Sequence, residues 1–196
     1  ADLEGFRYRL QNSLGKLREQ VIQAAVVHVE PERAVCGTFP GGELAGFIDL
    51  VMRTERQDCV IVDMKWSGSK KFPEKLRANR HLQLAIYAEL LRQHSGDWPS
   101  VAYYILDKAQ FFTPAPCAFP DAKVVPSDSG ENTAQLWQRF LAAWRWRVAQ
   151  IQAGRFEVVH DSIAEDDASK PPEDAMAMEV LNPNYNEYRT LAGWGC

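Results

Sequence analysis

The chain has few cysteines and no long apolar run, and these absences exclude several kinds of protein. Its four cysteines, at positions 36, 59, 117 and 196, form no Cys-x-x-Cys pair and no cluster with histidine, so the sequence contains no zinc or redox motif. No apolar stretch approaches the length that spans a bilayer, and no basic-then-apolar leader opens the chain. We therefore expect a reduced, cytoplasmic protein without a membrane segment.

An excess of positive charge is also absent. The 22 basic and 26 acidic side chains give a net charge of -4, which argues against a protein that binds nucleic acid mainly through bulk electrostatics. Aromatic residues are plentiful, with six tryptophans and nine phenylalanines, so a core can form without disulfides or structural metals. The chain begins without methionine and leads directly into a helical pattern, which suggests a piece of a longer polypeptide.

Hydrophobic periodicity predicts an α/β or α+β fold, with one central mixed sheet flanked by helices. Apolar residues recur at helical spacing in three segments, at residues 3–25, 73–94 and 132–153. Four segments have the composition of strands, at residues 24–29, 43–52, 59–64 and 101–106. The first of these strands is expected to end at Glu30 and Pro31.

The remaining segments predict the domain organisation. Residues 107–130 contain four prolines and are expected to form an extended connection, with at most a short strand at 123–125. Residues 1–160 are predicted to form one core. Residues 161–196 are predicted to form a loop and a tail that packs on this core.

Two acidic residues and a lysine lie at the ends of neighbouring predicted strands. Asp49 and Asp63 each come near the end of an apolar run. Because side chains alternate along a strand, Asp63 and Lys65 point to the same face, and in a hairpin Asp49 faces the same cleft. Two carboxylates suit Mg²⁺ or Mn²⁺, and the backbone carbonyl of Met64 can supply another oxygen ligand.

Lys65 has more than one chemical role open to it at such a site. Its amine can position or deprotonate an attacking water, or neutralise charge in the transition state of phosphodiester cleavage. The plain alternative is that Asp-x-Lys is a common triplet whose charges are solvated or paired with each other. We favour a functional site, because unpaired charge at the end of a core strand is costly to bury.

Positive charge is concentrated directly after this triplet. From Lys65 to Arg80 the sequence has six basic side chains and the single acid Glu74. Alone, such a run indicates a solvated face, but its place beside paired carboxylates favours contacts with DNA phosphates. The residues predicted to bind DNA are Lys70, Lys71, Lys75, Arg77 and Arg80. Trp66 either stacks on a base of single-stranded DNA or fills the core.

Three segments occur in the order of a known set of motifs: GFIDL at 46–50, VIVDMKWS at 60–67 and HLQLAIYAELL at 81–91. They resemble the GxxD, (D/E)xK and QxxxY motifs of RecB-like and AddB-like nucleases in the PD-(D/E)xK superfamily. The resemblance implies a restriction-endonuclease-like core in which Asp49 and Asp63 bind the metal and Lys65 is catalytic. It also implies that Gln83 and Tyr87, one helical turn apart, line the site and approach the DNA backbone. Without these motifs, a surface glutamine and a core aromatic residue are the simpler interpretations.

The resemblance implies two further features. An early helix is expected to contribute an acidic residue or a histidine to the metal, and Glu19 is the first candidate, ahead of Glu30 and His28. Some relatives hold an iron-sulfur cluster through one cysteine before the core and three close together after it. Here Cys196 is the only cysteine after Cys117, so no iron-sulfur cluster is predicted.

The function expected from these features is a Mg²⁺-dependent deoxyribonuclease, as the exonuclease module of a helicase-nuclease or of a DNA repair and recombination protein. Its partners are expected to be single-stranded or end-containing DNA and a helicase region in the same or a partner chain. A free-standing restriction-like endonuclease is a second enzymatic interpretation. A catalytically inactive nuclease fold that binds DNA or docks a protein is the alternative from another class. The intact set of Asp49, Asp63 and Lys65 favours the enzyme.

Overall fold

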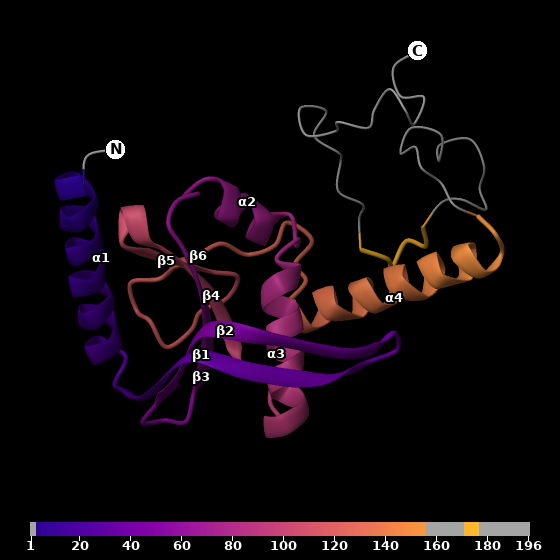
Figure 1. Cartoon of the computed structure of the whole chain (residues 1–196), viewed down its shortest axis with the longest axis horizontal. Coiled ribbons are helices and arrows are strands. Elements are labelled where there is room, and N and C mark those ends of the chain that lie inside the picture. Colours follow the sequence, from indigo (N-terminus) through magenta and orange to yellow (C-terminus); the bar gives the residue numbers. More distant parts are fainter. Residues whose placement is uncertain (1–2, 156–170, 177–196) are drawn as a thin grey trace, which may run out of the picture. The chain divides into compact units, whose positions relative to one another are not determined.

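Six strands form one mixed sheet in which neighbours in space are also neighbours in sequence (Figure 1). In order, the strands are β1 (Val26–Phe39), β2 (Gly42–Thr54), β3 (Cys59–Lys65), β4 (Ser100–Ile105), β5 (Gln110–Thr113) and β6 (Lys123–Val124). The β3–β4 and β5–β6 pairs are parallel, and the other pairs are antiparallel. This computed structural model describes residues 3–155 and 171–176.

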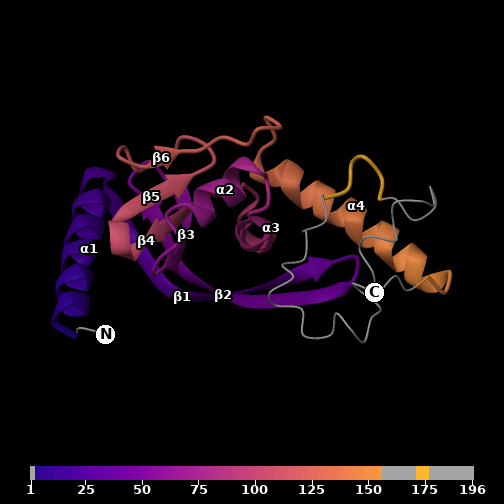
Figure 2. The ribbon, with the colours of Figure 1, turned by 90° about the horizontal axis from the view of Figure 1, so that it is seen from above.

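The helices α1 (Leu3–Gln23), α2 (Lys71–Arg77) and α3 (Leu82–Ser95) lie on the two faces of the sheet, α1 on one face and α2 and α3 on the other (Figure 2). The parallel strands β3 and β4 are joined through α2 and α3, as parallel neighbours require a crossover. A single 3-10 turn, η1 (Leu106–Lys108), follows β4. The mixed sheet between helices confirms the predicted fold class.

The last helix, α4 (Thr133–Gln152), contains the boundary between two compact units, residues 1–137 and 138–196. Within the second unit, the Arg139 guanidinium donates hydrogen bonds to the carbonyls of Glu173 and Ala175, each at 3.0 Å. The predicted packing of the tail falls largely on residues 161–170 and 177–196, which lie outside the described residues. The prediction of one core over residues 1–160 stays a prediction.

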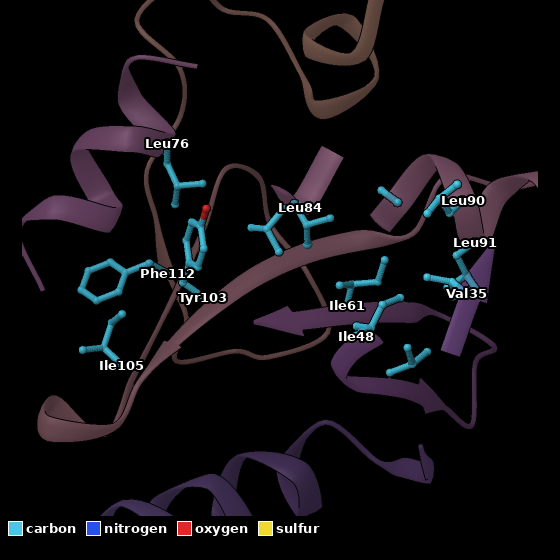
Figure 3. Packing of buried hydrophobic residues seen from close by; sticks show 13 residues of the cluster. Val35, Ile48, Ile61, Leu76, Leu84, Leu90, Leu91, Tyr103, Ile105 and Phe112 are labelled. Atoms are coloured by element: carbon cyan, nitrogen blue, oxygen red, sulfur yellow. The ribbon is translucent and has the colours of Figure 1, made fainter. Parts of the chain in front are cut away.

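Two apolar layers cover the two faces of the sheet, and β3 contributes to both. Ile61 packs toward α3 with Leu84 and Tyr103 (Figure 3), whereas Val60 and Val62 pack in the layer beneath α1. This alternation follows from the strand period of two. Both faces of β3 are therefore covered, as is typical of a dense apolar run, and Asp63 is buried near the end of this strand.

The predicted helix at 73–94 is wrong, because the structure has two helices separated by a turn. Asn79 adopts a left-handed backbone with φ 51°, which ends α2. The N–H of Arg80 bonds to the carbonyl of Lys75 at 2.8 Å, and the N–H of Asn79 bonds to the carbonyl of Leu76 at 3.0 Å. This is the bonding of a Schellman cap, for which asparagine is a suitable residue. The apolar periodicity continues across the break and hides it.

The first predicted strand, at 24–29, is too short, because β1 continues through Pro31 to Phe39. Proline lacks the N–H that an interior strand needs, but β1 lies at the edge of the sheet, where one side is not paired with a strand. The predicted end at Glu30 and Pro31 is therefore wrong. Pro31 still lies opposite Leu50 in the β1–β2 ladder.

One strand was missed in the connection predicted at 107–130. Ala109 adopts a left-handed backbone with φ 49°, and the chain then returns antiparallel to β4 as β5. Phe111 and Phe112 of β5 pack in the layers beneath α1 and α3 respectively. Four residues are too few for periodicity to reveal a strand, and the nearby prolines favoured a loop.

The β1–β2 hairpin extends beyond the rest of the sheet, and α3 borders its outer edge. The side-chain amide of Gln93 accepts a hydrogen bond from the N–H of Thr38 at 3.0 Å and donates one to the carbonyl of Thr38 at 2.8 Å. Nε2 of His94 donates to the carbonyl of Cys36 at 2.8 Å. Residues 36 and 38 project backbone groups to the same side, so the last turn of α3 covers this stretch of the β1 edge.

Candidate functional site

The candidate site begins where pairing between β2 and β3 stops. The β2–β3 ladder ends at Leu50 opposite Val62. Beyond it, β3 donates its next hydrogen bond toward β2 to a side chain and not to the backbone. The N–H of Met64 donates to Oδ2 of Asp49 at 2.6 Å. Since the N–H and C=O of one strand residue face the same neighbour, the Met64 carbonyl faces the same gap between the strands. Asp49 and this carbonyl therefore meet where the hairpin opens.

A change of face in β2 explains why Asp49 reaches this gap. Ile48 packs in the layer beneath α3, whereas Leu50 packs in the layer beneath α1. In a regular strand, residues two positions apart point to the same side. The strand therefore changes face at Asp49, and the carboxylate lies toward β3. The sequence did not reveal this irregularity, because both flanking residues are apolar.

Asp63 is almost completely buried, with 1% of its surface exposed. Nζ of Lys65 donates to Oδ1 of Asp63 at 2.9 Å and lies 2.8 Å from Oδ2. The Lys65 ammonium thus lies close to both oxygens of the buried carboxylate. Carboxylate oxygens are also the donors that a divalent cation such as Mg²⁺ prefers.

Burial raises the pKa of Asp63 above its ordinary value. The hydrogen bond and positive charge of Lys65 oppose this shift, and the neighbouring Asp49 carboxylate adds to it, so the pKa stays raised overall. Burial, and then the charge of Asp63, also raise the pKa of Tyr103, which lies opposite Asp63 on β4. One lysine thus offsets only part of the cost of the buried carboxylate, and a further cation would complete the compensation.

Phe72 lies near the Lys65 ammonium and was not identified from the sequence. Nζ of Lys65 and Nζ of Lys71 each lie 5.9 Å from the centre of the Phe72 ring. The ring in turn packs against Tyr103 at a centroid distance of 4.7 Å. Gly68 makes room for it, because a Cβ at position 68 would lie 2.7 Å from the ring. Phe72 therefore limits the positions open to the Lys65 ammonium.

Gln83 and Tyr87 share one face of α3, and Tyr87 connects this helix to β2. Nε2 of Gln83 lies 3.5 Å from the Tyr87 hydroxyl, the outer limit of a hydrogen bond. A Cβ on Gly46 would lie 3.0 Å from Cε1 of Tyr87, so the glycine lets the ring pack against the strand three residues before Asp49. The first and third motifs are thus in direct contact.

Glu19 does not join the two aspartates. Its carboxylate is exposed on α1 and pairs with Lys16 at 2.7 Å. Glu30 likewise pairs with neighbours on β1, His28 and Arg33. Across residues 3–155 and 171–176, no cluster of three or more histidine, cysteine, aspartate or glutamate side chains could hold a metal ion. The described donors are two carboxylates and one carbonyl, a set that suits Mg²⁺, which keeps several water ligands.

A model of one protein family matches most of the chain. The matching family is described as the PD-(D/E)XK nuclease superfamily, and the match covers residues 3–162. The chain belongs to the PD-(D/E)XK nuclease superfamily. Membership agrees with the mixed sheet and flanking helices of a restriction-endonuclease-like fold, and it implies a nuclease that uses divalent metal ions and binds DNA. No curated protein matches the chain.

The basic residues of this PD-(D/E)XK protein follow the site along the chain. Lys70, Lys71 and Arg77 are exposed on or beside α2, whereas Lys75 and Arg80 are half-buried. All five lie between the end of β3 and the start of α3. The structure therefore places the predicted DNA-binding residues together on the short segment that leaves the candidate site.

Trp66 is the first residue after β3, and it is not part of the core. It is 37% exposed, and its ring lies 4.6 Å from that of Phe6 on α1, which is 40% exposed. Of the two interpretations from the sequence, the core residue is therefore wrong. None of the helices in the described ranges is long and apolar enough to cross a membrane.

Proposed function

We propose that this PD-(D/E)XK protein is a Mg²⁺-dependent deoxyribonuclease of the RecB-like type, acting as a cytoplasmic exonuclease module in DNA repair or recombination. One observation carries the proposal: the buried Asp63 carboxylate lies at a strand end with Lys65 as its ion-pair partner and the Asp49 carboxylate beside it. A purely structural role does not explain why a second carboxylate lies beside a buried one, since like charges in a buried place disfavour each other.

The chain's own groups can hold a divalent ion at this place. Oδ2 of Asp63, the carboxylate of Asp49 and the Met64 carbonyl would be its ligands, with water and a DNA phosphate oxygen completing the shell. When bound, Mg²⁺ supplies a more acidic water and stabilises negative charge on the phosphate. Asp49 retains its hydrogen bond from Met64, which fixes the orientation of its carboxylate.

Lys65 acts in this proposal as a stabiliser of negative charge. Its ammonium lies 2.8 Å from Oδ2 of Asp63 and 5.9 Å from the centre of the Phe72 ring, and 28% of the side chain is exposed. An ammonium at this place can donate to a phosphate oxygen or orient the attacking water. Gln83 and Tyr87 share one face of α3, and Tyr87 packs on Gly46, so in this proposal they would contact the DNA backbone.

Cleavage of labelled DNA tests the proposal. The wild type should cut single-stranded or end-containing DNA with Mg²⁺ or Mn²⁺, and Asp63→Ala and Lys65→Ala should lose at least about 100-fold in rate. Lys65→Arg separates the two roles of the lysine, because arginine keeps the charge but cannot act as a base. Residual activity in Lys65→Arg well above Lys65→Ala supports charge stabilisation.

Two outcomes distinguish the alternatives. DNA binding without cleavage under either metal supports an inactive nuclease fold that docks DNA, the alternative from another class. Cleavage of linear but not of closed circular single-stranded DNA supports an exonuclease, whereas cutting of both supports an endonuclease. A helicase region in the same or a partner chain would feed DNA to the module, in keeping with its acidic net charge of -4.

A further inference from the structure

Strand β1 has a left-handed residue at the position that faces Asp49. Glu32 has a backbone φ of 48°, a conformation that residues other than glycine rarely adopt. The ladder between β1 and β2 keeps one register on both sides of it, with the flanking pairs Pro31–Leu50 and Arg33–Ile48. Glu32 and Asp49 therefore occupy the two facing positions between these pairs.

Side-chain packing shows that β1 and β2 change face together at this position. Facing residues of an antiparallel ladder point to the same side of the sheet. Ile48 packs in the layer beneath α3 (Figure 3), so its partner Arg33 lies on that face. Leu50 packs in the layer beneath α1, so its partner Pro31 lies on the other face. Residues two positions apart in a regular strand share a face, so β1 changes face at Glu32.

An ion pair spans Glu32 and supports the same conclusion. Glu30 and Arg33 are three residues apart, and in a regular strand they would point to opposite faces. Nη1 of Arg33 instead pairs with Oε2 of Glu30. Glu30 lies opposite Val51, which packs in the layer beneath α3, so the two charged side chains share that face. The change of face in β1 thus brings this pair together.

The change of face determines where the carboxylate of Asp49 lies. At this position Oδ2 accepts the N–H of Met64 at 2.6 Å, in the gap where β2 and β3 no longer pair. Since β1 and β2 keep their register, β2 can change face at Asp49 only where β1 does so too. We propose that Glu32 is a positioning residue whose left-handed backbone directs the Asp49 carboxylate toward β3. Its importance for metal binding and cleavage rests on the proposed nuclease function.

Hydrogen exchange at the Met64 amide tests the proposal in the metal-free protein, because this N–H bonds directly to Asp49. Glu32→Val should make this amide exchange at least about ten-fold faster relative to the amides of β4, since valine resists a positive φ and a hydrogen bond to a charged acceptor would be lost. Glu32→Ala removes the carboxylate without adding a β-branch, and it should exchange like the wild type. Faster exchange in Glu32→Ala would show that the carboxylate acts instead of the backbone, and it would contradict the proposal.

Glu43→Val is the matched control. It makes the same substitution at an exposed position of β2, opposite Thr38 in the regular part of the ladder, and it should leave the exchange of Met64 unchanged. Equal exchange of Met64 in Glu32→Val and Glu43→Val would overturn the proposal.

Thermal melting gives a second measurement that does not require Glu32→Val to fold. Glycine adopts a left-handed backbone without steric cost, so Glu32→Gly should melt roughly 2–4 °C above Glu32→Ala and keep the wild-type exchange of Met64. A Glu32→Gly variant that melts below Glu32→Ala, or that exchanges Met64 faster, would refute the role of this backbone. Neither measurement uses metal or DNA, so a protein that never cleaves DNA refutes the nuclease and leaves the result for Glu32 readable.

Discussion

Asp63 combines two unfavourable properties at the scale of a single residue. Its carboxylate is buried, and a second carboxylate, that of Asp49, lies beside it, and both raise its pKa. Native proteins usually avoid both conditions, and functional sites are where they are tolerated. The spacing of Asp63 and Lys65 on one face was predictable from strand alternation. The position of Asp49 in the strand gap was not, because it depends on the change of face in β2.

Replacing Asp63 by asparagine should separate folding stability from metal binding. The pKa of Asp63 is higher in the folded state than in the unfolded state, where it is about 3.9. Protonated Asp63 therefore contributes its full stability below about pH 3.9, and this contribution is lost as the pH rises through the pKa of the folded state. At neutral pH without metal, Asp63→Asn should therefore melt at or above the wild-type temperature. Mg²⁺ at about 100 times its Kd should raise the wild-type Tm by roughly 5–10 °C and leave the variant unchanged.

Thermal melts with and without Mg²⁺ measure both effects. The control is Asp97→Asn, which replaces an exposed aspartate and should respond to Mg²⁺ like the wild type. A metal-dependent increase in Tm that persists in Asp63→Asn would argue against a ligand role for this carboxylate.

Adding one methyl group at Gly46 should disturb the contact between β2 and α3. The new Cβ would lie 3.0 Å from Tyr87, tighter than an ordinary contact, so the ring must move. Overpacking of this kind costs about 1–3 kcal/mol, and we expect Gly46→Ala to lower the free energy of unfolding by that order. Gly15→Ala is the control, because nothing lies within 4 Å of its added Cβ on α1. That variant should gain roughly 1 kcal/mol in urea unfolding.

A second substitution identifies the cause of the loss. Tyr87→Leu removes the ring. In that background, adding Gly46→Ala should cost much less free energy of unfolding than Gly46→Ala costs in the wild type. If Gly46→Ala costs the same with or without the tyrosine ring, the packing explanation is wrong.

At the scale of elements, apolar patterns located most of the helices and strands but not their boundaries. The dense run of β3 and the stripes of α1 and α4 were readable because burial repeats at a regular period. The turn at Asn79 interrupts two helices whose apolar residues remain in phase, so periodicity could not separate them. The length of β1 depends on Pro31 lying at a sheet edge, which is a property of the assembled sheet.

His81, which precedes α3, should make folding sensitive to acid. Burial lowers its pKa to about 4, and its Nε2 lies 3.2 Å from the Thr133 hydroxyl. Because the pKa of His81 is lower in the folded state than its unfolded value of about 6.5, the stability contributed by neutral His81 is fully present above pH 6.5. This contribution decreases as the pH falls toward 4. The expected loss is about 3 kcal/mol across this range, at 1.36 kcal/mol per pKa unit. Urea unfolding at a series of pH values measures it.

His81→Gln should remove this part of the pH dependence, even if its stability at neutral pH is lower. His94→Gln replaces an exposed histidine that bonds to Cys36 and should keep the wild-type slope. A His81→Gln profile parallel to the wild type between pH 6.5 and 4 would contradict the assignment.

At the scale of the whole molecule, the charge is acidic overall and basic locally. The net charge of -4 coexists with a segment from Lys65 to Arg80 that has six basic side chains and one acidic side chain. Binding of DNA should therefore depend on this segment rather than on the molecule's general field. The composition alone indicated the first property, and the structure adds that the segment leaves the strand of Asp63.

Salt dependence should report how many phosphates this segment neutralises. For single-stranded DNA, each phosphate contact contributes about 0.7 to the slope of log K against log salt. Replacing both exposed lysines, Lys70→Gln with Lys71→Gln, should lower the magnitude of the slope by about 1.4. Lys16→Gln with Arg18→Gln, two exposed positions on α1, should leave the slope unchanged. Equal slopes for both pairs of variants would show that Lys70 and Lys71 do not contact phosphate.

The last turn of α3 has a consequence for how this molecule behaves among its own copies. An unpaired strand edge invites another strand to add to the sheet, which is a common start of aggregation. The carboxamide of Gln93 occupies the donor and acceptor of Thr38 as a neighbouring backbone would, and His94 takes the carbonyl at Cys36. An incoming strand would have to break these bonds first. The side chains of α3 thus form the hydrogen bonds that an added strand would form, and they prevent strand addition to this part of the β1 edge.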